Sequence, residues 1–265
     1  MNRIIAGQMI AADILKLRRN RAMMVTAALL SIGIAILYFA FVLLRHDGNF
    51  AGPQALADGA TLMGVYFGAF AAILIGAEAG TMDLTNGVFR DLAATGRSRI
   101  ALFLVRIPAA IAVALPLTLV GFGLSIVAAY AFHGSAEAPS AGQALEYAVW
   151  VALGTIIQTT FAVGMASLTR SRSITLVAII GWNTIATALI NFASFLGAAR
   201  DLVLLIALGR LSPGPAVGTR ANPGSSIALD NFKLPMPALV AVLVILAWAV
   251  IPAAAGAWRT RSQDA

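Results

Sequence analysis

Few residues of this chain are of the types that carry out chemistry. It has no cysteine and only two histidines, His46 and His133, which lie neither at metal-ligand spacing nor near a nucleophile motif. Glu137 and Glu146 fall close to His133 in the sequence but complete no diagnostic pattern. The chain also lacks a glycine-rich loop ending in Lys-Ser or Lys-Thr, so it has no nucleotide-binding motif of that kind. We therefore predict no catalytic residue, no metal site, no cofactor bound by this chain and no enzymatic activity.

Polar residues inside apolar stretches are the next candidates for function. Asn183, Thr187 and Asn191 are spaced at i, i+4 and i+8, which places them on one face of a helix. This face could line a cavity or a dimer seam along which a substrate passes. It could equally hydrogen-bond to a neighbouring helix within the chain. The sequence leaves both interpretations open.

One interior segment, Glu78–Arg106, mixes acids and arginines with helix signals between two apolar runs. Asn86 can cap a short helix through its side-chain oxygen, and Gly96 can end that helix in a left-handed conformation. Between these two positions, Phe89 and Leu92 fall on one face of the helix. The pattern predicts a short amphipathic helix at a membrane surface, available for binding by another protein.

Composition sets the fold class. Of the 265 residues, 60% are hydrophobic and 11% are charged, whereas soluble domains are roughly 25% charged. The apolar residues come in blocks close to the roughly 20 residues needed to cross a bilayer. We predict an all-α integral membrane protein with a single domain over residues 1–265. Its six predicted spans are approximately residues 22–44, 60–77, 100–132, 145–168, 174–196 and 238–257.

Three segments outside these spans differ from one another in sequence pattern and in the structure that it predicts. Residues 2–21 read as an amphipathic interfacial helix; they do not begin a signal peptide, because the apolar block at 22–44 is too long for one. Residues 45–59 read as a polar loop. Residues 198–237 contain a seven-residue apolar run that is too short to span, so they predict an outer re-entrant or interfacial segment.

The distribution of lysine and arginine predicts the orientation. The formal net charge is +7, but the basic residues border apolar blocks, which favours topology and lipid headgroups over nucleic acid. With the N-terminus inside, 13 of the 18 cations are cytoplasmic, and the outer side keeps Arg45, Arg200, Arg210, Arg220 and Lys233. We expect a cytoplasmic (inner) membrane location with both termini cytoplasmic. The Ala/Gly-rich composition is compatible with a bacterial source.

The segment around residues 83–106 resembles a motif of type-2 ABC exporter permeases. That motif has an acid, three residues, Gly, then Arg, Leu and a Ser-Arg pair before the next span. Here it is formed by Asp83, Gly87, Val88, Phe89, Arg90, Leu92, Thr95, Gly96, Ser98, Arg99 and Arg106. The family more often has Glu at position 83, Thr at 88, Pro at 96 and Lys at 106. With six predicted spans and a basic N-terminal helix, the resemblance covers nearly the whole chain.

The resemblance implies a function and partners. It implies the permease subunit of an exporter that moves a substrate outward, paired with a second, identical or different permease subunit. A separate ABC ATPase would bind ATP and Mg and drive transport. The residues that the resemblance assigns to coupling with this ATPase are Asp83, Gly87, Phe89, Arg90, Leu92, Arg97 and Arg99.

An alternative from a different class is a non-transporting polytopic membrane protein, such as an assembly scaffold or an immunity factor. It predicts no ATPase partner and no functional importance for Arg90. A secondary transporter is a third possibility. It generally needs ionisable residues within the membrane, and the predicted spans have almost none apart from Glu78 and Arg106 near one edge.

Overall fold

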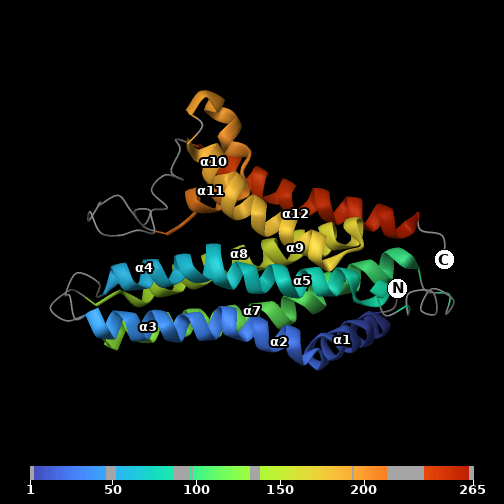
Figure 1. The fold of residues 1–265 in the computed structure, drawn as a ribbon, viewed down its shortest axis with the longest axis horizontal. Helices are drawn as coiled ribbons and strands as arrows, with labels where there is room; N and C mark the ends of the chain where they lie inside the picture. The colour runs from blue at the N-terminus through green and yellow to red at the C-terminus, as the bar shows by residue number, and fades with distance from the viewer. Residues whose placement is uncertain are drawn as a thin grey trace.

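A computed structural model gives the fold of the chain, and every regular element in its described part is a helix (Figure 1). It describes residues 3–45, 52–85, 87, 96, 98–131, 138–192, 194–213 and 236–262. The α-helices are α1 Arg3–Arg19, α2 Arg21–Ala28, α3 Ile34–Arg45, α4 Pro53–Thr61, α5 Phe67–Thr85, α7 Arg99–Ala131, α8 Ala141–Thr169, α9 Arg172–Gly181, α10 Thr187–Phe192, α11 Leu204–Arg210 and α12 Ala238–Arg261. Three π-turns, η1 Leu29–Gly33, η3 Leu62–Tyr66 and η4 Trp182–Ala186, and one 3₁₀ segment, η5 Ser194–Leu202, connect some of them.

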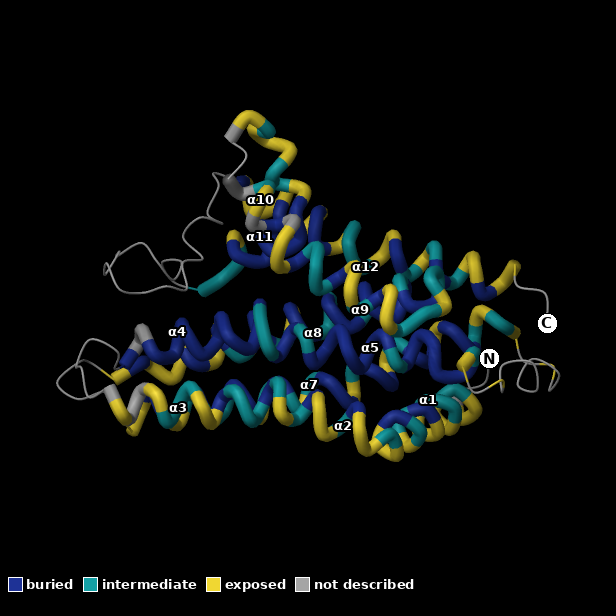
Figure 2. The backbone as a smooth tube through the Cα atoms, in the orientation of Figure 1, coloured by how far each residue is buried: buried dark blue, intermediate teal, exposed yellow. Residues whose placement is uncertain are grey.

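The long helices lie roughly side by side along the long axis of the molecule (Figure 1). Both chain termini lie at one end of this bundle, which we call the terminal end. Helix α5 packs against α7 and α8, and α12 packs against α8. Figure 2 shows that α5 is buried along most of its length, whereas α3 and α12 expose one side. The core is therefore built around α5 and α8.

Five helices of the described part are long and apolar enough to cross a membrane. They are Arg21–Phe41, Ala55–Thr85, Arg99–Ala131, Ala141–Thr169 and Ala238–Arg261. This is consistent with the predicted all-α, multi-pass membrane protein. The predicted span at 174–196 is not among the five, and its residues form α9, η4, α10 and the start of η5.

The predicted second span begins earlier in the structure than the sequence indicates. Residues 45–59 read as a polar loop, yet α4 begins at Pro53, which occupies the first helical turn after Gly52. Leu56 and the carboxylate-bearing Asp58 are both buried. Gly59 lies against Ser125 of α7, where a Cβ on residue 59 would clash with the serine Cβ. Close packing on α7, rather than local hydropathy, places these residues in the helix.

The N-terminal segment forms helix α1, as the periodicity predicts, and the chain turns at Asn20. The Asn20 side chain accepts a hydrogen bond from the Met23 backbone N–H at 3.2 Å and so caps α2. The side of α1 that is buried carries Asp13 and Leu17, whereas the apolar residues Ile5 and Leu15 are exposed. The interfacial location of α1 stays a prediction.

The segment predicted to be re-entrant or interfacial, residues 198–237, is described only in part. Its short apolar run forms the buried helix α11, which packs against α12. Trp248 of α12 donates from Nε1 to the Leu202 carbonyl at 2.8 Å, and this bond holds the residues just before α11 against α12. Residues 214–235 lie outside the described part.

Glycine at the α8–α12 contact leads to the first testable prediction. A Cβ on Gly164 would meet the backbone carbonyl of Pro252 at 2.5 Å, whereas a Cβ on Gly123 of α7 would meet nothing within 4 Å. We expect Gly164→Ala to destabilise the protein by about 1–3 kcal/mol through overpacking. Gly123→Ala should stabilise it by up to about 1 kcal/mol through helix propensity.

Equilibrium unfolding of both variants in detergent would measure the difference. Equal stabilities of the two variants would show that α8 and α12 do not pack through Gly164 in the native protein.

Candidate functional site

A cluster of charged side chains is buried at the terminal end of the bundle. Asp83, in the last turn of α5, accepts a hydrogen bond at 2.9 Å from NH2 of Arg106, which lies on α7. Both side chains are almost fully buried, at 6% and 2% exposed. Arg106 also donates from NH1 to the Gly80 carbonyl at 3.4 Å. Because an uncompensated charge in an apolar bundle is costly, this pair fixes the end of α5 against α7.

The N-terminal helix joins this cluster through Lys16. The Lys16 ammonium lies 3.0 Å from the second carboxylate oxygen of Asp83 and 3.0 Å from Asp13, one turn earlier in α1. The charges thus alternate in the order Asp13, Lys16, Asp83, Arg106. Two acids and two bases make the cluster electrically balanced, and they connect α1, α5 and α7.

Titration of the two α1 residues follows from this arrangement. Burial raises the pKa of the Asp13 carboxyl above its ordinary value of 3.8, although Lys16 opposes the shift. Burial lowers the pKa of the Lys16 ammonium, but the hydrogen bonds and the attraction of both aspartates outweigh it, so that the net shift is upward from 10.5.

The signs of these shifts determine their effects on stability. The contribution from Asp13 is present at low pH and is lost as pH rises through its folded pKa. The contribution from Lys16 is fully present below pH 10.5 and is lost only as pH rises through the folded pKa above it. At neutral pH, Lys16 therefore supports the folded state and ionised Asp13 does not.

A second polar contact lies beside the first and includes α9. Glu78 of α5 accepts from Arg172 NH1 at 2.8 Å and from the Asn20 side-chain amide at 2.8 Å. Since Asn20 also caps α2, one carboxylate holds the α1–α2 corner and the start of α9 to α5. Asn20 and Arg172 both lie at helix ends, so polar contacts add to the apolar packing at the terminal end of the bundle.

A tight turn between α8 and α9 positions Arg172. Arg170 ends α8 in the left-handed conformation with φ 56°, and Ser171 accepts a hydrogen bond from the Ile174 N–H at 3.3 Å. The hydroxyls of Thr169 and Thr175 lie 2.7 Å apart across the turn. The local sequence TRSRS thus reverses the chain within two residues and directs Arg172 toward Glu78.

The predicted coupling segment is described only at its margins. Gly87 and Gly96 have positive φ, at 70° and 77°, as the predicted helix end at Gly96 requires. Arg99 begins α7 and is half-buried. The other predicted coupling residues, Phe89, Arg90, Leu92 and Arg97, lie outside the described residues.

The structure shows which members of the charge cluster the sequence analysis missed. Asp83 was assigned to coupling, and Arg106 belonged only to the motif. The contact of Asp83 with Lys16 was not foreseen, because the two residues are 67 positions apart. An acid and an arginine within otherwise apolar stretches could have signalled the buried pair, since such residues are usually paired.

Of the predicted polar face Asn183, Thr187 and Asn191, the structure places Asn183 in contact with a residue of α8. The Asn183 amide donates to Gln158 Oε1 at 3.3 Å, and both side chains are buried. Thr187 is buried and donates to the Trp182 carbonyl at 3.0 Å, five residues back across the π-turn. The Asn191 side chain is not among the described groups. That this face lines a cavity or a dimer seam stays a prediction.

The Asn183–Gln158 pair has unused hydrogen-bonding capacity in the described structure. Gln158 Nε2 and Asn183 Oδ1 have no partner there. A single hydrogen bond between two carboxamides always leaves at least one donor and one acceptor, whichever way the amides are turned. The site can therefore accept a water molecule or a polar group that offers both a donor and an acceptor.

Comparison with known proteins does not assign the chain. No family model and no curated protein sequence matches it. The functional argument therefore depends on the residues and their geometry.

The charge cluster leads to a second prediction. Asp83→Asn removes the carboxylate that neutralises buried Arg106, and we expect it to destabilise the protein by about 3–5 kcal/mol. Asp13→Asn is the matched control: Lys16 keeps Asp83 and the cost of burying an ionised Asp13 disappears, so the change should stay within about 1 kcal/mol. Unfolding in detergent at pH 7 measures both.

The double variant Asp83→Asn, Arg106→Gln separates charge from packing. It leaves no unpaired charge on α7, so it should recover part of the stability lost in Asp83→Asn. If Asp83→Asn is as stable as Asp13→Asn, the ion pair does not hold α5 to α7.

Proposed function

We propose that this chain is the transmembrane permease subunit of an ATP-binding cassette exporter. It moves a substrate outward across the cytoplasmic membrane, and a separate ATPase subunit drives it. In this proposal α9, η4 and α10 provide a sixth crossing beside the five long apolar helices. A second permease subunit, identical or different, completes the transport path.

The observation that carries the proposal is the position of the charge cluster. Asp83 and Arg106 are the first and last residues of the motif that resembles exporter permeases, and they are joined at 2.9 Å. Lys16 adds the N-terminal helix to the same point. A displacement of the coupling segment by an ATPase would therefore act on α1, α5 and α7 together. An ATPase that binds one arrangement of these helices more tightly would shift the population toward it.

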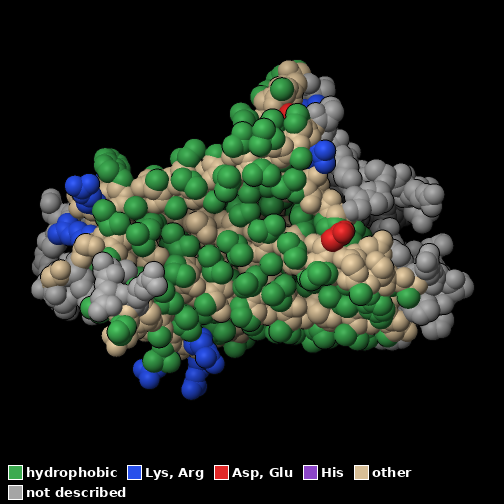
Figure 3. Space-filling view, turned by 180° about the vertical axis from the view of Figure 1, so that it is seen from behind, with side chains coloured by type: hydrophobic (Ala, Val, Ile, Leu, Met, Phe, Trp, Pro, Cys, Tyr) green, Lys and Arg blue, Asp and Glu red, His purple; other side chains and the backbone are tan. Residues whose placement is uncertain are grey.

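Charge distribution supports the orientation in this proposal. Cations gather at the terminal end, where α1 and α8 end, α7 and α9 begin and α12 ends; the described ones are Lys16, Arg18, Arg19, Arg21, Arg99, Arg106, Arg170, Arg172, Arg259 and Arg261. Figure 3 shows basic side chains at this end and an apolar surface along the bundle. The positive-inside rule then favours a cytoplasmic location for both termini and for the coupling segment.

Cysteine labelling tests this orientation. Cysteines introduced at Ser135 and Ser225 should react with an impermeant thiol reagent added to intact cells, because both positions are outside in the proposed topology. A cysteine at Ser98 should react only after the membrane is opened. Since the chain has no cysteine of its own, the background is clean. Labelling at Ser98 alone in intact cells would reverse the orientation.

The coupling prediction concerns Phe89 and Arg90. An aromatic residue that anchors an interface commonly costs about 2 kcal/mol or more when truncated, and a rim charge costs less. Phe89→Ala should therefore weaken co-purification with the ATPase at least roughly tenfold and abolish permease-stimulated ATP turnover. Arg90→Ala should weaken binding less, and its effect should shrink as salt is added.

The chain is purified from its source cells, and a co-purifying partner that carries a nucleotide-binding motif is quantified. ATP turnover is then measured after reconstitution of the complex. A normally expressed Phe89→Ala protein that keeps its ATPase and full turnover would exclude this segment as the coupling element. Phe89 would then serve as an anchor in the lipid interface. Absence of any ATPase partner for the functional wild-type complex would favour a non-transporting membrane protein.

A further inference from the structure

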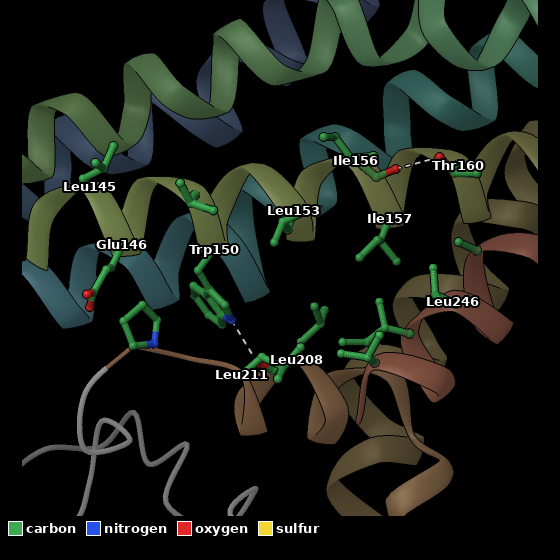
Figure 4. A pocket seen from close by; sticks show the side chains of 15 residues that line it. Leu145, Glu146, Trp150, Leu153, Ile156, Ile157, Thr160, Leu208, Leu211 and Leu246 are labelled. Carbon is green, nitrogen blue, oxygen red and sulfur yellow. Dashed lines mark hydrogen bonds between the residues drawn. The ribbon is translucent and has the colours of Figure 1, made fainter. Parts of the chain in front are cut away.

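An open apolar groove runs along one side of the bundle, between α8, α11 and α12 (Figure 4). Its volume of about 800 Å³ falls within the range of ligand sites, roughly 300–1,000 Å³. Leu153 and Ile157 of α8, Leu208 of α11 and Leu246 of α12 are among the side chains that line it. The groove is separate from the charge cluster and from the Asn183–Gln158 pair.

The polar groups in the groove wall are already satisfied. Trp150 donates from Nε1 to the Leu208 carbonyl at 2.9 Å, and this bond ties α8 to α11. The Thr160 hydroxyl donates to the Ile156 carbonyl at 2.8 Å within α8. Figure 4 shows both bonds as dashed lines. Away from its rim the groove therefore offers contact surface to an apolar chain and no hydrogen-bonding site to a polar molecule.

The groove is long enough to extend through one leaflet of a bilayer. Its lining on α8 extends from Leu145 to Thr160, which at 1.5 Å per residue is roughly 22 Å. One leaflet contributes about half of a hydrocarbon core that is roughly 30 Å thick. The groove starts near the first residues of α8, at the end of the bundle opposite the termini. It thus covers the depth of an acyl chain in the leaflet on that side.

Two exposed residues of opposite charge belong to the helices that form the groove. Glu146 is exposed and is the acidic residue in the groove lining. Arg210 is exposed at the end of α11, between the lining residues Leu208 and Leu211, and donates from Nε to the Met236 carbonyl at 2.7 Å. A carboxylate in the lining, together with a guanidinium on the residue between two lining positions of the α11 end, complements a headgroup that carries both an ammonium and a phosphate.

We propose that this groove binds one acyl chain of an aminophospholipid, with phosphatidylethanolamine as the chemical class. The lipid comes from the leaflet opposite the terminal end; its ammonium faces Glu146 and its phosphate faces Arg210. The bound chain fills the surface between α8, α11 and α12. This inference does not depend on the proposed transport function.

Two leucines on α12 provide a matched test. Leu246 lines the groove and is 53% exposed, whereas Leu243 is 57% exposed and does not line it. Leu246→Trp should fill the groove and displace several methylene groups of the acyl chain, so bound lipid should fall at least roughly tenfold. Leu243→Trp should leave it unchanged. Both proteins are purified in detergent from phosphatidylethanolamine-containing membranes, and bound lipid is counted by native mass spectrometry.

Headgroup recognition is tested on the same preparations. Delipidated protein is titrated with phosphatidylethanolamine and with phosphatidylcholine, and thermal stabilisation is followed. The wild type should prefer phosphatidylethanolamine, because its ammonium can donate hydrogen bonds to Glu146 and a trimethylated amine cannot. Glu146→Gln should remove this preference while keeping binding of the chain.

Three outcomes would overturn the proposal. Equal loss of lipid in both tryptophan variants would mean general surface lipid without a site. Equal retention in both would mean that the groove holds no lipid. A change of oligomeric state in Leu246→Trp with unchanged lipid content would mean that a second copy of the chain covers the groove.

Discussion

An ion pair buried in an apolar bundle is the constraint on which the terminal end of this protein depends. Asp83 and Arg106 are both nearly inaccessible to solvent, so each needs the other to remain charged at an acceptable cost. Their contact fixes the register between the end of α5 and the first turns of α7. Lys16 and Asp13 extend the same alternation of charge to α1. The geometry of three helices is therefore set by electrostatics rather than by apolar packing alone.

This constraint determines how the segment between α5 and α7 can act. Because Asp83 precedes the segment and Arg106 follows it, their contact holds the two ends of the segment close together. Glu78 adds a parallel connection to Asn20 and Arg172, and so to α2 and α9. Four separate stretches of chain thus meet beside the predicted coupling segment: α5, α7, the α1–α2 corner and the start of α9. In the proposed exporter, a partner that binds this segment would act on all four stretches of chain without contacting the membrane-spanning helices.

Much of the helical architecture could be predicted from the sequence, because blocks of about 20 apolar residues and their basic borders are local signals. The predicted span at 238–257 agrees with α12 to within a few residues. The start of the second span was misplaced because Asp58 and Gly59 look like a loop, and only their packing on α7 reveals a helix. The contact of Lys16 with Asp83 could not be predicted, since nothing local specifies which acid a distant lysine meets. The Asn183–Gln158 bond was missed for the same reason.

The charge cluster and the Asn183–Gln158 pair differ in how many of their hydrogen-bonding groups have partners. The charge cluster is matched by alternating partners, whereas the Asn183–Gln158 pair keeps spare hydrogen-bonding capacity beside the π-turn η4. π-turns inside helices occur frequently at functional positions. Both amides lie on helical segments that meet at the Arg170–Ser171 turn, at roughly 18 Å from it along each helix. Arg172 ties that turn to Glu78. Among the described residues, the Gln158 and Asn183 amides and the neighbouring Trp182 indole N–H are thus buried polar groups that can take a further partner.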